Sequence, residues 1–178
     1  MIASREALRS AAGRRLALGA EITAQFFEAE ADAVARACAA LARRFERGGR
    51  LLAFGEGSAM SDAQHVAVEF VHPVLVGKRA LSALAVEPSS VALLGRTQDI
   101  ALAISHASPG DAVARALREA RARGMLTVAL SGAPADAAFA FVVPCDDACV
   151  VQEVQETLYH VLWELVHVFF EQRVLGLR

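Results

Sequence analysis

The chain has 178 residues, of which 55% are hydrophobic and 21% are charged, and its formal net charge is −2. This length is typical of one domain with a substantial core, and the small net charge gives no reason to expect binding to nucleic acid or to an anionic membrane. A soluble monomer this apolar would be unusual, so we expect part of the surface to be buried between identical subunits.

The sequence also indicates a compartment. No apolar run approaches the roughly 20 residues that span a bilayer, and the N-terminus lacks the apolar region of a signal peptide. Cys38, Cys145 and Cys149 are odd in number and lack zinc-finger spacing. Cys145 and Cys149 could pair or bind a metal, but we interpret all three as reduced thiols, which predicts a cytoplasmic protein.

Helices and short apolar runs follow one another along the chain. Residues 4–47 are rich in Ala, Arg, Glu and Leu and are predicted to form two helices, the second from about Ala31 to Phe45 with Gly48 as its cap. Predicted strands then lie at residues 50–55, 81–86, 99–105, 125–131 and 138–144. Predicted helices lie at about 60–72, from Pro109 to Gly124, and at about 148–174.

Strands that alternate with helices are typical of a parallel sheet covered on both faces. The sequence therefore predicts a single α/β domain over residues 1–178. It would contain a three-layer arrangement of about five parallel strands, with a helical extension at the N-terminus. Ligands bind such sheets beyond the carboxyl ends of the strands, which directs attention to residues 55–62, 87–90 and 105–111.

Two of these loops have the composition of a ligand-binding site. "GEGSAMSDAQH" contains glycines that let backbone amides approach an anion before a helix begins, although Glu56 would repel a phosphate unless paired. "SHASPGD" offers the hydroxyls of Ser105 and Ser108. We interpret Ser108 as the cap of the helix that Pro109 opens, a role compatible with phosphate binding.

Polar side chains also interrupt two apolar helices. His65 and Glu69 lie one turn apart on one face, and Gln152 and His160 share a face of the last helix. Because an unpaired buried charge is costly, the polar pair either satisfies itself or binds a metal or substrate. A lone histidine in such a helix, such as His167, is more often a packing residue.

Glu69 and His72 also have the spacing found in di-iron bundles. The strand-rich sequence argues against that architecture. His72 is instead expected to end its helix before Pro73.

Together these segments resemble the phosphoheptose isomerase family of sugar isomerase (SIS) domains. "GEGSAMSDAQHVAVE" matches the family's glycine-rich loop, its Asp-Ala-x-His and its downstream Glu, and "QEVQETLYH" matches its Gln-Glu with a His eight residues after the Gln. The resemblance covers nearly the whole chain. It implies a homo-oligomer, a tetramer with a dimer as the alternative, assembled through helices in residues 1–47, and a flavodoxin-like α/β core over residues 48–178.

The resemblance further implies the roles of individual residues. Glu69 corresponds to the family's base and His160 to its acid/base partner, in the isomerisation of a sugar phosphate through an enediol. A zinc site is implied at the residues that correspond to the zinc ligands of some members: His65, Glu69, Gln152 and His160. The residues expected to bind substrate are Gly57, Ser58, Ser105, His106, Ser108 and Gln152.

Several positions depart from the family pattern. The third loop, "SHASPG", stands where the family has Ser-Thr-Ser-Gly-Asn-Ser, so His106, Ala107 and Gly110 replace hydroxyl side chains. In the first loop, Glu56 replaces an Asn and Ala59 replaces a Ser. Residues 93–105 are expected to pass directly between two strands, without the additional helix of the family.

These departures leave three functions open. We favour a sugar phosphate isomerase, because the proton-transfer residues are retained. The alternatives are a noncatalytic binding protein like the family's regulatory branch, and a metal-dependent SIS enzyme with a different substrate. A protonated His106 and the pair Lys78-Arg79 could supply the positive charge that the altered loop lacks.

Overall fold

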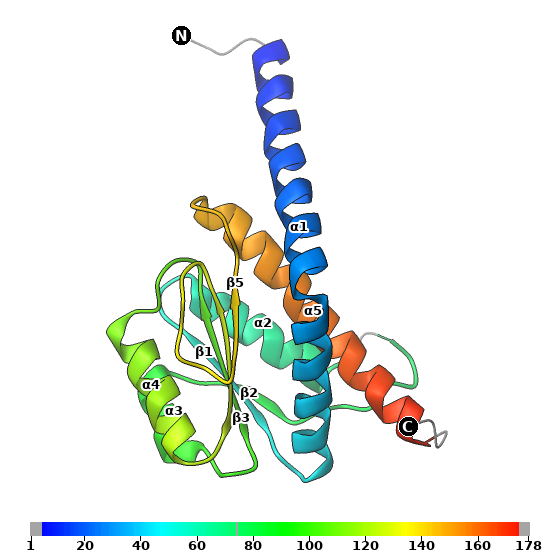
Figure 1. Cartoon of the computed structure of the whole chain (residues 1–178), viewed down its shortest axis with the longest axis vertical. Coiled ribbons are helices and arrows are strands. Elements are labelled where there is room, and N and C mark those ends of the chain that lie inside the picture. Colours follow the sequence, from blue (N-terminus) through cyan, green and yellow to red (C-terminus); the bar gives the residue numbers. More distant parts are fainter. Residues whose placement is uncertain (1–4, 74, 175–178) are drawn as a thin grey trace.

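A parallel five-stranded sheet forms the centre of the protein, which the computed structural model describes over residues 5–73 and 75–174 (Figure 1). In chain order the strands are β1 (Leu51–Gly55), β2 (Ala83–Ala85), β3 (Ile100–Ser105), β4 (Leu126–Ser131) and β5 (Phe139–Val142). They lie in the order β2-β1-β3-β4-β5, and every neighbouring pair is parallel. This flavodoxin-like order confirms the predicted α/β fold. Each strand lies within a predicted strand.

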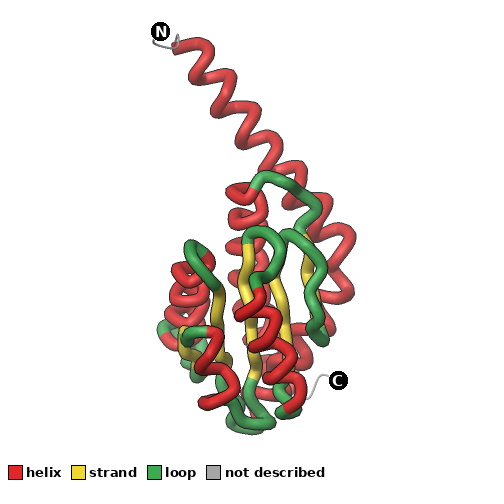
Figure 2. Tube along the Cα trace, turned by 90° about the vertical axis from the view of Figure 1, so that its left-hand side faces the viewer, coloured by secondary structure: helices red, strands yellow, loops and turns green. Residues whose placement is uncertain are grey.

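Helices cover both faces of this sheet (Figure 2). They are α1 (Arg5–Glu46), α2 (Ala59–Val71), α3 (Pro88–Leu94), α4 (Asp111–Ala122) and α5 (Ala148–Val174). Successive side chains of a strand point to opposite faces. Thus Leu51 and Ala53 pack in a core with α1, α2 and α5, whereas Leu52 and Phe54 pack in a second core with α3 and α4. The predicted three layers are confirmed.

Helix α1 is continuous, so the prediction of two N-terminal helices is wrong. Residues 20–46 contain neither glycine nor proline, and nothing in this segment ends a helix. The helix does end as expected: Gly48 has a φ of 77°, and its N–H donates to the carbonyl of Phe45. Although α1 has 42 residues, neither it nor any other described helix is long and apolar enough to cross a membrane.

The two halves of α1 have different environments. Residues 34–45 contribute Val34, Ala37, Cys38, Leu41, Ala42 and Phe45 to the core. The N-terminal half projects beyond the rest of the protein (Figure 1). The core therefore includes part of residues 1–47, the segment that the family resemblance assigns to oligomerisation.

The connection from β2 to β3 contains the short helix α3. Of residues 93–105, which are expected to pass directly between two strands, only Leu93 and Leu94 belong to this helix, so the expectation is wrong for these two residues alone. Proline is favoured in the first turn of a helix, where its missing N–H is not needed, and α3 begins at Pro88. This helix packs against α4 on the second face of the sheet.

Buried Asp99 joins the amino-terminal ends of β1 and β3. Its carboxylate accepts hydrogen bonds from the backbone N–H of Arg50 at 2.9 Å, from the Arg50 guanidinium at 2.7 Å and from the N–H of Arg96 at 3.0 Å. Burial alone would raise the pKa of Asp99, but these hydrogen bonds outweigh burial and lower it. The carboxylate therefore stabilises the fold above its unfolded pKa, and this contribution is lost as the pH falls through its folded pKa.

Candidate active site

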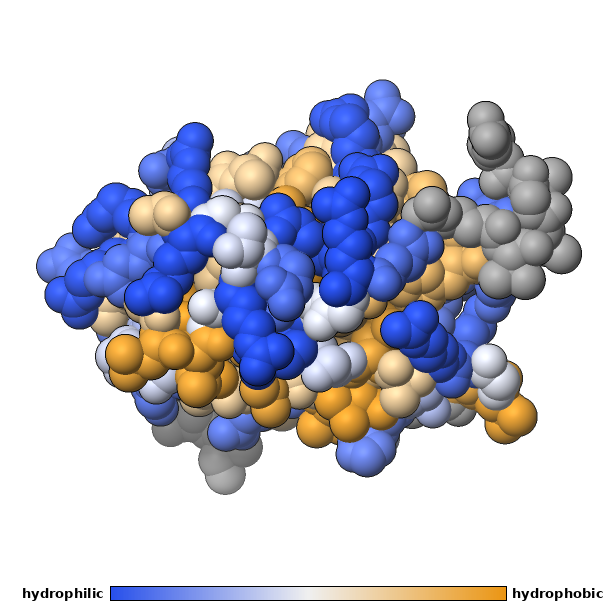
Figure 3. All heavy atoms as spheres, turned by 90° about the horizontal axis from the view of Figure 1, so that it is seen from below, coloured by the Kyte–Doolittle hydropathy of each residue, from blue (hydrophilic) through white to orange (hydrophobic). Residues whose placement is uncertain are grey.

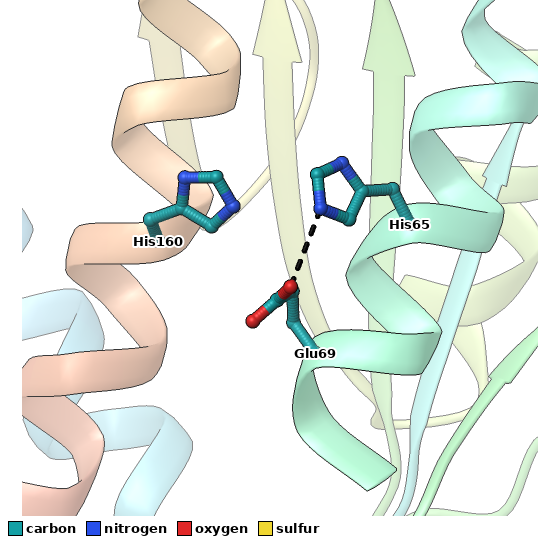
Figure 4. Close-up of side chains that lie close together, drawn as sticks. All are labelled: His65, Glu69 and His160. Carbon is teal, nitrogen blue, oxygen red and sulfur yellow. Dashed lines mark ion pairs between the residues drawn. The ribbon is translucent and has the colours of Figure 1, made fainter. Parts of the chain in front are cut away.

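Helices α2 and α5 bring together His65, Glu69 and His160 (Figure 4). The Nε2 atom of His65 lies 3.3 Å from Oε1 of Glu69, and the rings of His65 and His160 have centroids 5.2 Å apart. One nitrogen or oxygen of each residue lies within 4.8 Å of the others. The structure thus joins two motifs that are about 90 residues apart in the sequence.

The donor atoms of this cluster suit a divalent metal or a proton transfer. Two imidazole nitrogens and one carboxylate oxygen are the ligand types of catalytic zinc sites, which use three protein ligands and leave a position open. The side chain of Glu69 is 17% exposed, so solvent only partly surrounds it. These three residues are among the four implied metal ligands, and they lie close enough together to share one ion.

Tyr159 fixes the opposite side of the His65 ring and was not anticipated from the sequence. Its hydroxyl lies 2.8 Å from Nδ1 of His65. Burial raises the pKa of Tyr159, and the nearby carboxylates of Glu156, Asp62 and Glu69 raise it further, so the phenol stays protonated at neutral pH. A buried tyrosine needs a hydrogen-bond partner for its hydroxyl, and its position beside His160 in "LYH" was the signal available.

Gln152 lies against Asp62 in the structure. Its Nε2 donates to both carboxylate oxygens of Asp62, each at 3.2 Å. Asp62 is only 6% exposed and also lies 2.8 Å from Nε2 of His106. This one carboxylate therefore links α2, α5 and the loop after β3.

A cavity of about 320 Å³ lies beyond the carboxyl ends of β1 and β3. Nδ1 of His106 lies 3.3 Å from Oγ of Ser58, which joins the two loops across it. The cavity contains four of the residues predicted to bind substrate: Ser58, Ser105, His106 and Ser108. Gly57, a fifth, has a φ of 58° at the turn before α2, a conformation that favours glycine.

The two serines of the third loop differ in role. Helix α4 begins at Asp111, its N-cap is Gly110, and no side chain caps it, so the interpretation of Ser108 as a cap is wrong. Pro109 and Gly110 lie before the helix and separate Ser108 from its first turn. The hydroxyl of Ser105 donates to the carbonyls of Ala107 and Ser108, each at 3.1 Å, and so holds the loop itself.

The remaining candidates have structural roles. His72 is the C-cap of α2, as expected. His167 is buried, with its ring nitrogens 2.8 Å from the carbonyl of Trp163 and 2.9 Å from that of Arg79. Lys78 pairs with Glu171 and Arg79 lies over the ring of Phe170, so both cations contact α5 rather than line the cavity.

Known proteins are similar to this chain in sequence and in architecture. The model of the SIS domain family matches residues 17–94. The phosphoheptose isomerase of Solidesulfovibrio magneticus is 34% identical over 172 residues, which cover 83% of this chain and 84% of that protein. The phosphoheptose isomerase of Desulfovibrio desulfuricans is 31% identical over 183 residues, covering 89% and 87%.

Solved structures agree on the fold. A phosphoheptose isomerase from Francisella tularensis superposes with a TM-score of 0.78 at 23% identity, over 89% of this chain and 97% of that one. One from Neisseria gonorrhoeae gives a TM-score of 0.78 at 21% identity, over 89% and 98%. The predicted resemblance is therefore confirmed.

Proposed function

Because the chain belongs to the phosphoheptose isomerase family of SIS domain proteins, we propose that it is an aldose–ketose isomerase of a sugar phosphate, with sedoheptulose 7-phosphate as the first candidate substrate. The observation that carries this proposal is the convergence of Glu69 and His160 from two helices. A carboxylate and an imidazole at this separation can act on adjacent atoms of one bound molecule.

The proposed reaction is a proton transfer through an enediol. Glu69 takes a proton from the carbon next to the carbonyl while His160 gives a proton to the carbonyl oxygen. Glu69 then returns its proton to the former carbonyl carbon, and His160 takes a proton from the hydroxyl of the neighbouring carbon. Both residues end in their starting states, so the cycle balances.

We also propose that His65, Glu69 and His160 hold zinc. The donor types and their mutual distances, all within 4.8 Å, fit this ion. When bound, zinc would polarise the substrate's carbonyl oxygen. Gln152 remains in the proposal as a substrate-binding residue and as the fourth ligand; its Nε2 donates to Asp62, and an amide binds a metal through its oxygen.

The proposed assembly is a homotetramer, with a dimer as the alternative, in the cytoplasm. The projecting half of α1 exposes Leu8 (59%) and Leu16 (75%), which a partner helix could cover. Apolar side chains also lie among charged ones on the face seen in Figure 3. Removing residues 1–24, while keeping the buried residues 34–45, should lower the mass measured by light scattering. An unchanged mass would place the interface elsewhere. The proposed cytoplasmic location is tested separately by cell fractionation.

The test of the activity uses sedoheptulose 7-phosphate in deuterated water. The protein should form an aldose phosphate and incorporate solvent deuterium, and Glu69→Gln should lower kcat by about a thousandfold because the base is lost. The control is Glu164→Gln, which should keep full activity. Glu164 is exposed on α5, the helix that also carries His160. Binding of the sugar phosphate without isomerisation in the unmodified protein would favour the noncatalytic alternative.

A further inference from the structure

The cavity beyond β1 and β3 lies at the N-terminal end of α2, and Glu69 of the proton-transfer cluster lies farther along the same helix. Asp62, whose carboxylate binds the cavity residue His106, precedes Glu69 by seven residues on α2. At about 1.5 Å per residue, this spacing is about 10 Å along the helix axis. A sugar whose reacting carbons lie at Glu69 would therefore extend its far end toward this cavity.

The charges around the cavity do not suit a phosphate at that end. Among the described residues, the lining contains neither lysine nor arginine, and His106 is its only potential cation. The buried carboxylate of Asp62 lies 2.8 Å from His106, which offsets any positive charge on the ring. Glu56 also lines the cavity, and no ion pair joins it to a cation among the described residues.

The carboxylate of Glu56 lies at the start of helix α4. A Cβ atom added to Gly110, the N-cap of α4, would come within 2.3 Å of Oε2 of Glu56. Negative groups are favoured at the amino-terminal end of a helix. The carboxylate of Glu56 therefore occupies the position at which the N-terminus of α4 would most stabilise a bound phosphate.

We propose that Glu56 is a specificity-determining residue that weakens the binding of the substrate's phosphate in this cavity. The inference rests on the proposed function, since it assigns the far end of the same substrate. Two negative groups cannot share the small space beside Gly110 without repulsion. Glu56 has to move toward solvent before a phosphate binds, and it competes with the phosphate for as long as it is ionised.

The experiment replaces Glu56 with glutamine, which keeps the size of the side chain and removes its charge. The KM for sedoheptulose 7-phosphate and the Ki of inorganic phosphate should both fall about tenfold, while kcat changes less than threefold because the proton-transfer residues are untouched. The differences in KM and Ki between Glu56→Gln and the unmodified protein should become smaller as salt is added, since salt screens repulsion at an exposed site. Glu119→Gln, an exposed residue of α4 outside the cavity, makes the same change of net charge and should alter neither constant.

Equal constants for Glu56→Gln and Glu119→Gln would overturn the proposal, as would an effect of Glu56→Gln that does not depend on salt. Calorimetric titration with inorganic phosphate separates this outcome from failure of the proposed function. If no form of the protein isomerises the sugar phosphate, tighter phosphate binding by Glu56→Gln still supports the role of Glu56. Phosphate binding that is undetectable in both proteins contradicts it.

Discussion

The cluster between α2 and α5 and the cavity beyond β1 and β3 contrast in how they relate to the family. At the cluster, His65, Glu69 and His160 all match the family motifs, and the structure brings them within reach of one ion. At the cavity, Glu56 and His106 replace family residues and introduce a carboxylate and an imidazole. This comparison supports our proposals that the proton-transfer chemistry is retained and that the recognition of the substrate's far end has changed.

Asp62 connects these two regions. It lies one turn before His65 on α2, accepts hydrogen bonds from Gln152 of α5, and contacts His106 of the third loop. Its carboxylate therefore contacts one residue of the cavity, His106, and Gln152 on α5, the helix that carries His160. Substitutions of residues that belong to only one region can still test the two regions independently.

The largest expected effect is at the cluster. His160→Gln should lower kcat about a thousandfold, because glutamine cannot exchange a proton with the carbonyl oxygen. Binding of inorganic phosphate, measured by calorimetry, should be unchanged if the two regions are separate. A loss of phosphate binding in this variant would show that the cluster, and not the cavity, binds the anion.

A smaller effect on both regions is expected from Asp62→Asn. The uncharged amide weakens the contacts to His106 and Gln152, and we expect kcat/KM to fall by 10- to 100-fold. Loss of charge-assisted hydrogen bonds at this buried site should lower the free energy of unfolding by about 1–3 kcal/mol, measured by urea denaturation. A variant with normal kcat/KM would show that Asp62 has only a packing role.

Tyr159→Phe should affect metal binding rather than the cavity. Partners that hold the second ring nitrogen of a metal-bound histidine typically change metal affinity by 10- to 100-fold, and Tyr159 holds Nδ1 of His65 at 2.8 Å. We expect zinc to bind about tenfold more weakly, measured by competition with a fluorescent chelator. Equal zinc affinity would mean that the hydroxyl does not orient His65 for a metal.

The sequence could predict which site residues share a face of one helix, but not how two helices pack together. His65 and Glu69 could be placed on one face because helical periodicity determines which residues of one element share a side. The approach of His160 depends on how α5 packs on α2, and here the family resemblance supplied what periodicity could not. Tyr159 was missed because adjacency in the sequence does not say which side chain turns toward a neighbouring helix.

Errors in the fold have similar physical causes. The division of α1 into two helices imposed a break where residues 20–46 have no helix-ending residue. Strands were placed well because buried apolar runs between glycines and polar turns are distinctive. The start of α4 was misplaced because proline is compatible with both the first turn of a helix and the extended segment before it.

The misplaced start of α4 leads to the smallest expected effect, that of Ser108→Ala. Removal of a capping serine typically costs about 1 kcal/mol, but no side chain caps α4, so the free energy of unfolding should change by less than about 0.5 kcal/mol. If Ser108 instead donates a hydrogen bond to substrate from the cavity wall, the KM should rise about fivefold, as expected for a contact worth about 1 kcal/mol. Denaturation and steady-state kinetics on the same preparation measure the two quantities. A destabilised variant with normal KM would restore the capping interpretation, whereas no change in either quantity would remove Ser108 from the substrate-binding residues and weaken the case that the sugar occupies this cavity.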